Sequence, residues 1–188
     1  MANQLSFISN NSTDVETKKQ EASIEKKPVI KKNKVVLQFY IDGAARNNPG
    51  PAGAGVYIIK NDMPYAKKAY FLESKTNNQA EYLALLLALY HMHELKQNMT
   101  IDRIVFYSDS KLLVQQMMGI YRVKNICLQR YVSTARILLK QCNYTFKHIL
   151  RHANGIADGL ANDGIDNKVS LPAEFIKIMQ KYGITLSE

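Results

Sequence analysis

The stretch from Val35 to Asp42, VVLQFYID, constrains the fold more than any other part of the sequence. Apolar residues alternate along it with more polar ones, and this period of two is typical of a β-strand with one buried face. Asp42 ends the run, and the glycines and prolines of GAARNNPGPAGAG follow at once. Such residues favour a turn. We therefore expect a strand at residues 35–42 that ends in a carboxylate.

The remaining elements predict a mixed sheet. Two more strands, at residues 53–60 and 65–73, follow over short links, as in an antiparallel meander. Strands at residues 102–109 and 144–150 are reached through helices, which is typical of parallel neighbours. The expected fold class is therefore α/β, with a five-stranded sheet that is part antiparallel meander and part parallel, flanked by helices. The helices are expected at residues 76–96, 110–119, 126–142, 154–166 and 171–183.

The helix at residues 76–96 carries clear local signals. Thr76 and Gln79 fit a capping box, in which each side chain satisfies a free backbone donor of the other residue. The run LALLLALY makes this helix apolar on several sides, so both a sheet and a neighbouring helix should cover it. His91 and His93 lack the HExxH pattern of a zinc site, and we assign them to a solvated face. Asn154 is expected to cap the later helix.

Composition narrows the class of protein. The formal charge of +9 suggests a polyanionic partner, although a solvated basic surface explains it as well. Cys127 and Cys142 have no metal-binding spacing, so we interpret both as reduced core thiols. The sequence shows neither a secretory signal nor an apolar run of about 20 residues. We therefore expect a cytoplasmic protein without a membrane span.

The chain divides into three parts. Residues 1–34 are polar and rich in lysine, which predicts a flexible tail. This tail either adds loose phosphate contacts or serves only as a solubilising leader. Residues 35–167 hold the expected sheet and its helices. Residues 168–188 form a C-terminal helical extension, to which we assign no function.

Four carboxylates fall at the ends of expected elements: Asp42, Glu81, Asp109 and Asp158. Asp42 and Asp109 should be adjacent, because parallel strands end at the same edge of a sheet. Each acid also has an ordinary explanation as a turn starter, a cap or a partner of a helix dipole. Four converging carboxylates would repel one another unless hard cations such as Mg²⁺, or Mn²⁺, were bound. Two such ions are suited to in-line phosphoryl transfer.

Amides and glycines lie close to these acids in the sequence. Asn48, Asn77, Asn78 and Gln79 are able to contact base edges, sugars or 2′-hydroxyl groups. The glycine-rich loop that begins at Gly43 lets a backbone approach a sugar-phosphate chain closely. The same amides also suit ordinary turns and helix caps, so the residues alone leave both interpretations open.

Four blocks together resemble type 1 ribonuclease H over about residues 35–167: DGAARNNPGPAGAG, TNNQAEYLALLLAL, YSDSKLLVQQMMG and RHANGIADGLAN. The resemblance implies a ribonuclease H-like catalytic domain that hydrolyses the RNA strand of RNA/DNA hybrids. It also implies catalysis by two Mg²⁺ ions, leaving 5′-phosphate and 3′-hydroxyl ends. The implied catalytic and metal-binding residues are Asp42, Glu81, Asp109 and Asp158. The implied substrate-binding residues are Gly43, Asn48, Asn77, Asn78, Gln79 and Arg151.

Two departures from the family pattern matter. The connector IYRVKN is short and the chain has no Trp, so it resembles the branch without a basic, Trp-rich substrate handle. His152 does not match the Gly-His pair that many members place before the last acid, whereas Arg151 suits a phosphate contact. An RNA/DNA hybrid is the expected partner of a monomer with no obligate protein partner.

Two alternative functions remain open. One is another nuclease of the same architecture, resolvase-like or transposase-like. The other is a module that binds hybrid or double-stranded RNA without cutting it. The four acids count against a pure binding module, because carboxylates that face phosphates weaken binding.

Overall fold

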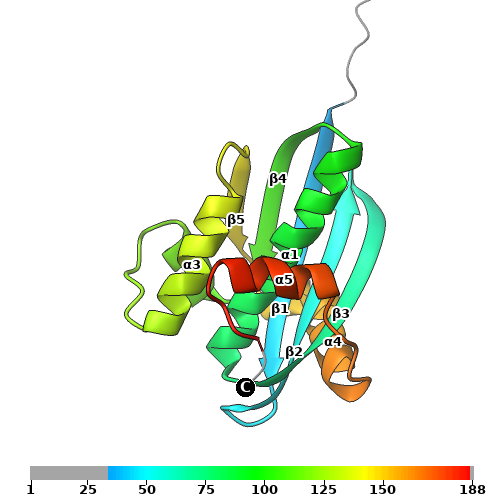
Figure 1. Ribbon diagram of the computed structural model, residues 1–188. Helices are drawn as coiled ribbons and strands as arrows, with labels where there is room; N and C mark the ends of the chain where they lie inside the picture. Colours follow the sequence, from blue (N-terminus) through cyan, green and yellow to red (C-terminus); the bar gives the residue numbers. More distant parts are fainter. Residues whose placement is uncertain (1–33, 187–188) are drawn as a thin grey trace, which may run out of the picture. The chain divides into compact units, whose positions relative to one another are not determined.

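The computed structural model describes residues 34–186, so the tail expected at residues 1–34 lies almost wholly outside the described residues. Five strands form one sheet in the order β3-β2-β1-β4-β5 (Figure 1). β1 pairs antiparallel with β2 and parallel with β4, which confirms the predicted mixed sheet. The strands are β1 (Val35–Ala45), β2 (Gly50–Lys60), β3 (Met63–Lys75), β4 (Ile101–Ser108) and β5 (Tyr144–His148).

β1 is longer than predicted, and the expectation that it ends at Asp42 is wrong. The strand continues to Ala45, and Asp42 pairs with Gly55 of β2. The glycines and alanines on both strands keep the ladder regular here, with Gly43 opposite Ala54 and Ala45 opposite Ala52. The turn is therefore confined to the few residues between Ala45 and Gly50. Asp42 is a strand residue and does not open a turn.

Helices cover both faces of the sheet. The helices are α1 (Asn77–Asn98), α2 (Lys111–Met117), α3 (Ile126–Leu138), the 3₁₀ turn η1 (Arg151–Ala153), α4 (Gly155–Asp166) and α5 (Ala173–Lys181). Gly43 of β1 lies against the backbone of α1, whereas Gly55 of β2 lies against α4. Since neighbouring residues of a strand point to opposite faces, and Gly55 pairs with Asp42, α1 and α4 lie on opposite faces. Figure 1 shows α3 and α5 on the same side as α1.

Local signals set the helix ends. The capping box is present: the Thr76 hydroxyl accepts from the backbone N–H of Gln79, and the Gln79 side chain accepts from the backbone N–H of Thr76. Ser110 caps α2 and Asn125 caps α3 through their side-chain oxygens. Asn154 precedes α4 as predicted, but its side chain makes no capping hydrogen bond.

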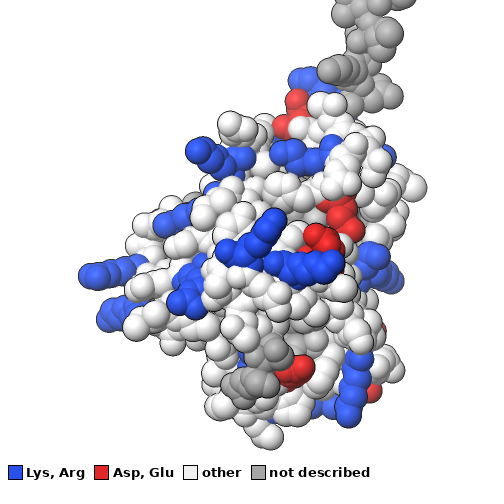
Figure 2. Space-filling model, in the orientation of Figure 1, with Lys and Arg blue, Asp and Glu red and all other residues white. Residues whose placement is uncertain are grey.

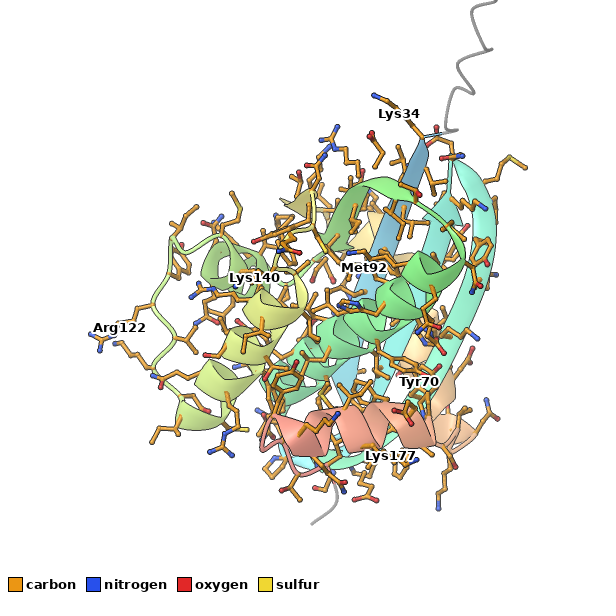
Figure 3. All side chains as sticks on the ribbon, turned by 45° about the horizontal axis from the view of Figure 1, so that its top comes forward. Lys34, Tyr70, Met92, Arg122, Lys140 and Lys177 are labelled. Carbon is orange, nitrogen blue, oxygen red and sulfur yellow. The ribbon has the colours of Figure 1, made fainter. Side chains whose placement is uncertain are left out.

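The core lies between the sheet and α1. Phe39 of β1, Phe106 of β4 and Phe146 of β5 form a row of stacked rings, with centroids 5.4 and 5.0 Å apart. The residues of α1 from Ala80 to Leu89 are fully or almost fully buried, so this helix is covered on several sides as expected. Figure 3 shows Met92 of α1 within the domain.

His91 corrects one expectation. It is buried, not on a solvated face, and its ring bonds Tyr70 and Glu94 at 2.8 Å each. The ring takes this place because β3 and α1 meet at that turn of the helix, a contact that helical periodicity does not reveal. Burial lowers the pKa of His91.

Basic side chains are spread over the face that carries α1, α3 and α5, rather than gathered in one patch (Figure 2). Arg122, in the connector between α2 and α3, points away from the body of the domain (Figure 3). Among the described helices, none is long and apolar enough to cross a membrane. Cys127 and Cys142 are both free and pack partly buried against the core.

Candidate active site

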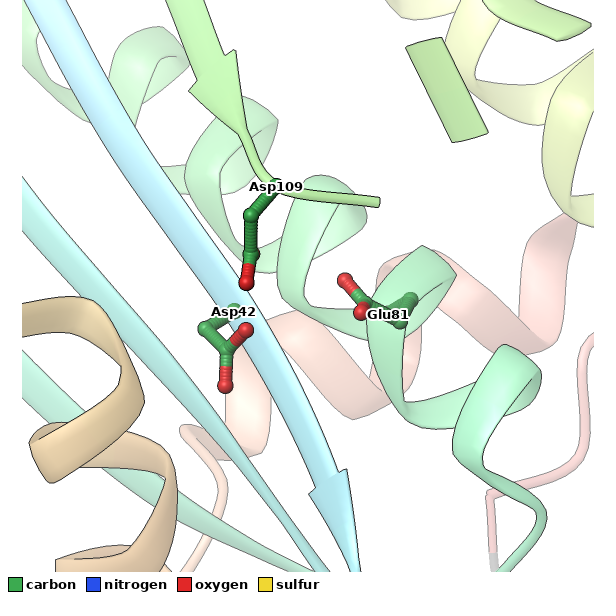
Figure 4. Close-up of side chains that lie close together, drawn as sticks. All are labelled: Asp42, Glu81 and Asp109. Carbon is green, nitrogen blue, oxygen red and sulfur yellow. The ribbon is translucent and has the colours of Figure 1, made fainter. Parts of the chain in front are cut away.

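Three of the four predicted acids lie together. Asp42, Glu81 and Asp109 each offer a carboxylate oxygen, and these oxygens lie within 4.8 Å of one another. Figure 4 shows the three side chains converging from β1, from α1 and from the end of β4. Asp42 and Glu81 are only 5% and 7% exposed, and Asp109 is partly buried. We call these three carboxylates the acidic nest. It lies near the C-terminal ends of the central strands β1 and β4.

The sheet and one glycine bring these acids together. Tyr40 of β1 pairs with Tyr107 of β4 in parallel register, so Asp42 and Asp109, each two residues further along, are neighbours on one face. Gly43 lets β1 approach α1 so closely that a Cβ there would collide with the backbone of Ala80 and Glu81. Glu81 is therefore held beside Asp42 of β1 and the end of β4.

The ordinary explanations for these acids do not hold in the structure. Asp42 is inside a strand, so it does not start a turn. Glu81 is not in the first turn of α1, where a carboxylate would favour the helix dipole. Ser110, rather than Asp109, caps α2. None of the three is kept in place by a local structural role.

Burial and mutual repulsion make this nest costly to ionise. Burial is the main cause that raises the pKa of Asp42 to about 7, followed by the charges of Asp109 and Asp158. Burial likewise raises the pKa of Glu81 well above its usual value, and Asp42 and Asp109 add to the effect. The backbone N–H of Gly43 partly offsets this rise by donating to the Glu81 carboxylate.

Asp158, the fourth predicted acid, is not part of this group. It sits in the first turn of α4, and its carboxylate accepts from Arg151 at 3.1 Å and from Asn162 at 3.5 Å. Its charge nevertheless contributes to the raised pKa of Asp42, so it faces the same site. Its role as a metal ligand stays a prediction.

The nest fits a divalent cation. Glu81 Oε2 is buried without a hydrogen-bond partner, which is costly unless something else satisfies it. Oxygen ligands without sulfur or imidazole suit Mg²⁺ or Mn²⁺ rather than zinc. A bound cation would also remove the repulsion that raises the pKa values of Asp42 and Glu81.

Four of the predicted substrate-binding residues, Asn48, Asn77, Asn78 and Gln79, form a rim at the start of α1, whereas Gly43 lies in β1 and Arg151 in η1. Asn48 Oδ1 accepts from the backbone N–H of Asn77 at 2.8 Å, so the β1–β2 loop is tied to this helix end. Asn48, Asn77 and Asn78 are all exposed. The Gln79 side chain is engaged in the capping box and also lies 3.5 Å from Cys127 Sγ.

Asn154 is the residue of the site that sequence reasoning missed. It is 1% exposed, and its Nδ2 donates to Asp109 Oδ1 at 2.8 Å and to the backbone oxygen of Ile41 at 3.0 Å. Its place in the block RHANGIADGLAN, four residues before Asp158, is the signal in the sequence, but local pattern predicts only a helix cap there. His148 Nε2 also lies 3.2 Å from the backbone oxygen of Asp109.

Comparisons with known proteins agree with this geometry. The model of a family described as "Reverse transcriptase-like" matches residues 40–164. A ribonuclease HI of Halobacterium salinarum is 36% identical over 133 residues, which are 70% of this chain and 65% of that protein. The match thus spans less than two thirds of that relative's length.

Solved structures show the same architecture. The crystal structure of RNase H1 from Halobacterium salinarum matches with a TM-score of 0.66 and 34% identity, covering 70% of this chain and 98% of that one. The structure of LC11-RNase H1 in complex with an RNA/DNA hybrid matches equally, with a TM-score of 0.66 and 34% identity, over 71% of this chain and 98% of that one. The chain belongs to the type 1 ribonuclease H family.

Proposed function

We propose that this protein is a ribonuclease H, an endonuclease that hydrolyses the RNA strand of RNA/DNA hybrids with divalent cations. One observation carries the proposal: the carboxylates of Asp42, Glu81 and Asp109 converge in one buried nest on a ribonuclease H scaffold. The similarity to LC11-RNase H1, which was solved with an RNA/DNA hybrid, supports the substrate.

The chemistry follows from the acids. We propose that Asp42, Glu81, Asp109 and Asp158 together hold two Mg²⁺ ions, or Mn²⁺ ions. When bound, such a pair stabilises the attacking and the leaving oxygen of an in-line displacement at phosphorus, here giving 5′-phosphate and 3′-hydroxyl ends. We include Asp158 for two reasons. Its charge already acts on Asp42. Its ion-pair partner Arg151 is exposed, so burial does not hold this ion pair closed.

The rim at the start of α1 is the proposed surface for reading the hybrid. Asn48, Asn77 and Asn78 carry exposed amides that both donate and accept hydrogen bonds, as contacts to base edges and 2′-hydroxyl groups require. Arg151 is the proposed phosphate contact. Two other expected contacts have structural roles instead. Gly43 is buried against α1, and Gln79 is engaged in the capping box, so both hold the start of α1 in place.

Substituting one acid tests the assignment. Asp109→Asn keeps the size of the side chain and removes its charge, so cleavage of a labelled hybrid should fall by about 100-fold or more. Asp102→Asn is the matched control, because Asp102 is exposed at the opposite end of β4. A folded Asp109→Asn protein that cuts at the wild-type rate would refute the site.

A panel of substrates separates this function from its alternatives. The wild-type protein should cut the RNA of a hybrid in Mg²⁺ or Mn²⁺ and leave duplex DNA, double-stranded RNA and single-stranded RNA intact. Cleavage of DNA would indicate a resolvase-like or transposase-like nuclease. Binding of hybrid without cleavage in either cation would indicate a binding module.

The same proposal includes a monomer acting in the cytoplasm without an obligate protein partner. Sedimentation of the purified full chain at the concentration of the cleavage assay tests whether the protein is a monomer. Cleavage by a homogeneous preparation tests whether it acts without a protein partner, because an obligate partner would be missing from that preparation.

A further inference from the structure

Asn154 makes two contacts that fix the orientation of its side chain. Nδ2 donates to Asp109 Oδ1 at 2.8 Å and to the backbone oxygen of Ile41 at 3.0 Å. Both partners only accept hydrogen bonds, so the amide nitrogen must face them. The side chain is 1% exposed and caps no helix, although Asn154 directly precedes α4.

These two bonds join the elements that carry three of the acids. Ile41 directly precedes Asp42 on β1, Asp109 follows β4, and Asp158 lies one turn into the helix that Asn154 precedes. One amide therefore links both strands of the nest to the start of α4. The bond to Asp109 Oδ1 also fixes the orientation of the Asp109 carboxylate relative to the nest.

The remaining acceptor of Asn154 is unsatisfied. Within residues 34–186, only two buried side-chain polar atoms lack a hydrogen-bond partner, namely Asn154 Oδ1 and Glu81 Oε2. Glu81 belongs to the acidic nest, and Asn154 is hydrogen-bonded to Asp109 of the nest. Buried acceptors of this kind are usually explained by a functional partner or a water. A hydrated Mg²⁺ ion brings suitable donors, because it keeps several of its waters.

We infer that Asn154 is a positioning residue of the metal site: it holds Asp109 and the part of β1 around Ile41 and Asp42 in the geometry that binds the cations. The inference rests on the metal site of the proposed function, but not on the nucleic acid that is cut. Residues that orient metal ligands by hydrogen bonding typically change metal affinity or activity by about 10–100-fold when they are removed.

Metal binding without nucleic acid is the direct test. Asn154→Ala and Asn154→Ser both lose the two hydrogen bonds to Asp109 and Ile41. In a titration of the full chain with Mg²⁺ alone, followed by amide NMR shifts at the nest, both should bind about 10-fold more weakly than the wild type, or worse. The Mg²⁺ concentration for half-maximal cleavage should rise by a similar factor, whereas KM for the hybrid at saturating Mg²⁺ should not change.

A matched control separates positioning from stability. Asn125 also directly precedes a helix, and its side chain accepts from the backbone N–H of Leu128 at 3.0 Å, in the cap of α3. Asn125→Ala should lower the thermal stability and leave the Mg²⁺ affinity unchanged. If Asn154→Ala does not fold, Asn154→Ser, which keeps a small polar side chain, carries the test.

Failure of the positioning role can be told apart from failure of the proposed function. A folded Asn154 variant with a Mg²⁺ affinity within about twofold of the wild type would overturn the inference, even if its stability fell. If the variant loses Mg²⁺ affinity but the wild type cuts no hybrid, the positioning role stands and the proposed substrate fails.

Discussion

At the scale of single residues, the nest shows how burial turns ordinary acids into a site that depends on cations. Asp42 and Glu81 are almost fully buried, yet no basic side chain is bonded to either among the described residues. The pKa of Asp42 rises to about 7 because burial and the charges of Asp109 and Asp158 disfavour its ionised form. The folded protein therefore resists ionisation of this carboxyl, whereas the unfolded chain does not.

The pH dependence of stability follows from the direction of this shift. Because the folded-state pKa of Asp42 lies above its usual value of 3.8, its contribution to stability is full below pH 4 and is lost as the pH rises through about 7. Without metal, Asp42→Asn should therefore unfold about 2–4 °C above the wild type at pH 8, a gain of about 1 kcal/mol.

Thermal unfolding with a chelator at pH 8 and at pH 4 measures this effect. At pH 4 the advantage of Asp42→Asn should shrink or vanish, because the wild-type carboxyl is then protonated in the folded protein. An equal difference in Tm at both pH values would contradict the raised pKa.

At the scale of elements, small residues decide how closely helices approach the sheet. Gly55 of β2 lies where a Cβ would collide with the backbone oxygen of Ala157 in α4. Asp158 is the next residue of that helix, so this close approach also sets the distance of the fourth acid from β1. The glycines of the loop were predicted to serve a nucleic acid, but Gly55 serves the packing of α4.

Gly55→Ala should therefore cost about 1–3 kcal/mol in unfolding free energy, because α4 must move away from the sheet. Hybrid cleavage should fall as well, since Asp158 moves with the helix. Gly159→Ala in α4 is the control: a Cβ there meets nothing within 4 Å, and replacing a helical glycine should stabilise the protein by about 0.5–1 kcal/mol. Urea denaturation of both variants measures the two effects, and a stable Gly55→Ala protein would refute the packing argument.

At the scale of the whole described domain, α5 and the residues after it complete the core. Phe175 and Met179 are 0% exposed, and Phe175 packs edge to face against Tyr90 of α1, with ring centroids 5.8 Å apart. The backbone N–H of Phe71 in β3 donates to Val169, so the preceding segment also joins the sheet edge. The family match ends at residue 164, so this part of the core lies beyond it.

Phe175→Ala should cost about 3–5 kcal/mol in unfolding free energy, as for other large buried aromatic residues. Lys177→Ala in the same helix should change it by less than about 1 kcal/mol, because Lys177 forms only an exposed ion pair with Glu174. Urea denaturation gives both values. A loss below about 1 kcal/mol for Phe175→Ala would show that α5 is not part of the core.

Local sequence patterns were sufficient to predict those elements whose deciding contacts lie within a few residues of one another. The alternation in VVLQFYID determined a strand, Thr76 and Gln79 determined the start of α1, and the order of strands and helices determined a mixed sheet. Strand and helix periodicity depend on neighbours up to four residues apart, which is why the sequence carries these signals. The ends of the expected elements singled out Asp42, Glu81, Asp109 and Asp158, and the resemblance to the family implied that these four acids bind metal.

The sequence predicted that four acids converge, but the tertiary structure decided which side chains meet. It placed Asp42, Glu81 and Asp109 together, held Asp158 beside Arg151, and buried His91 against Tyr70. It also turned Asn154 away from its helix toward Ile41, 113 residues earlier in the chain. No local pattern encodes such contacts, because they depend on how strands and helices pack after the chain has folded.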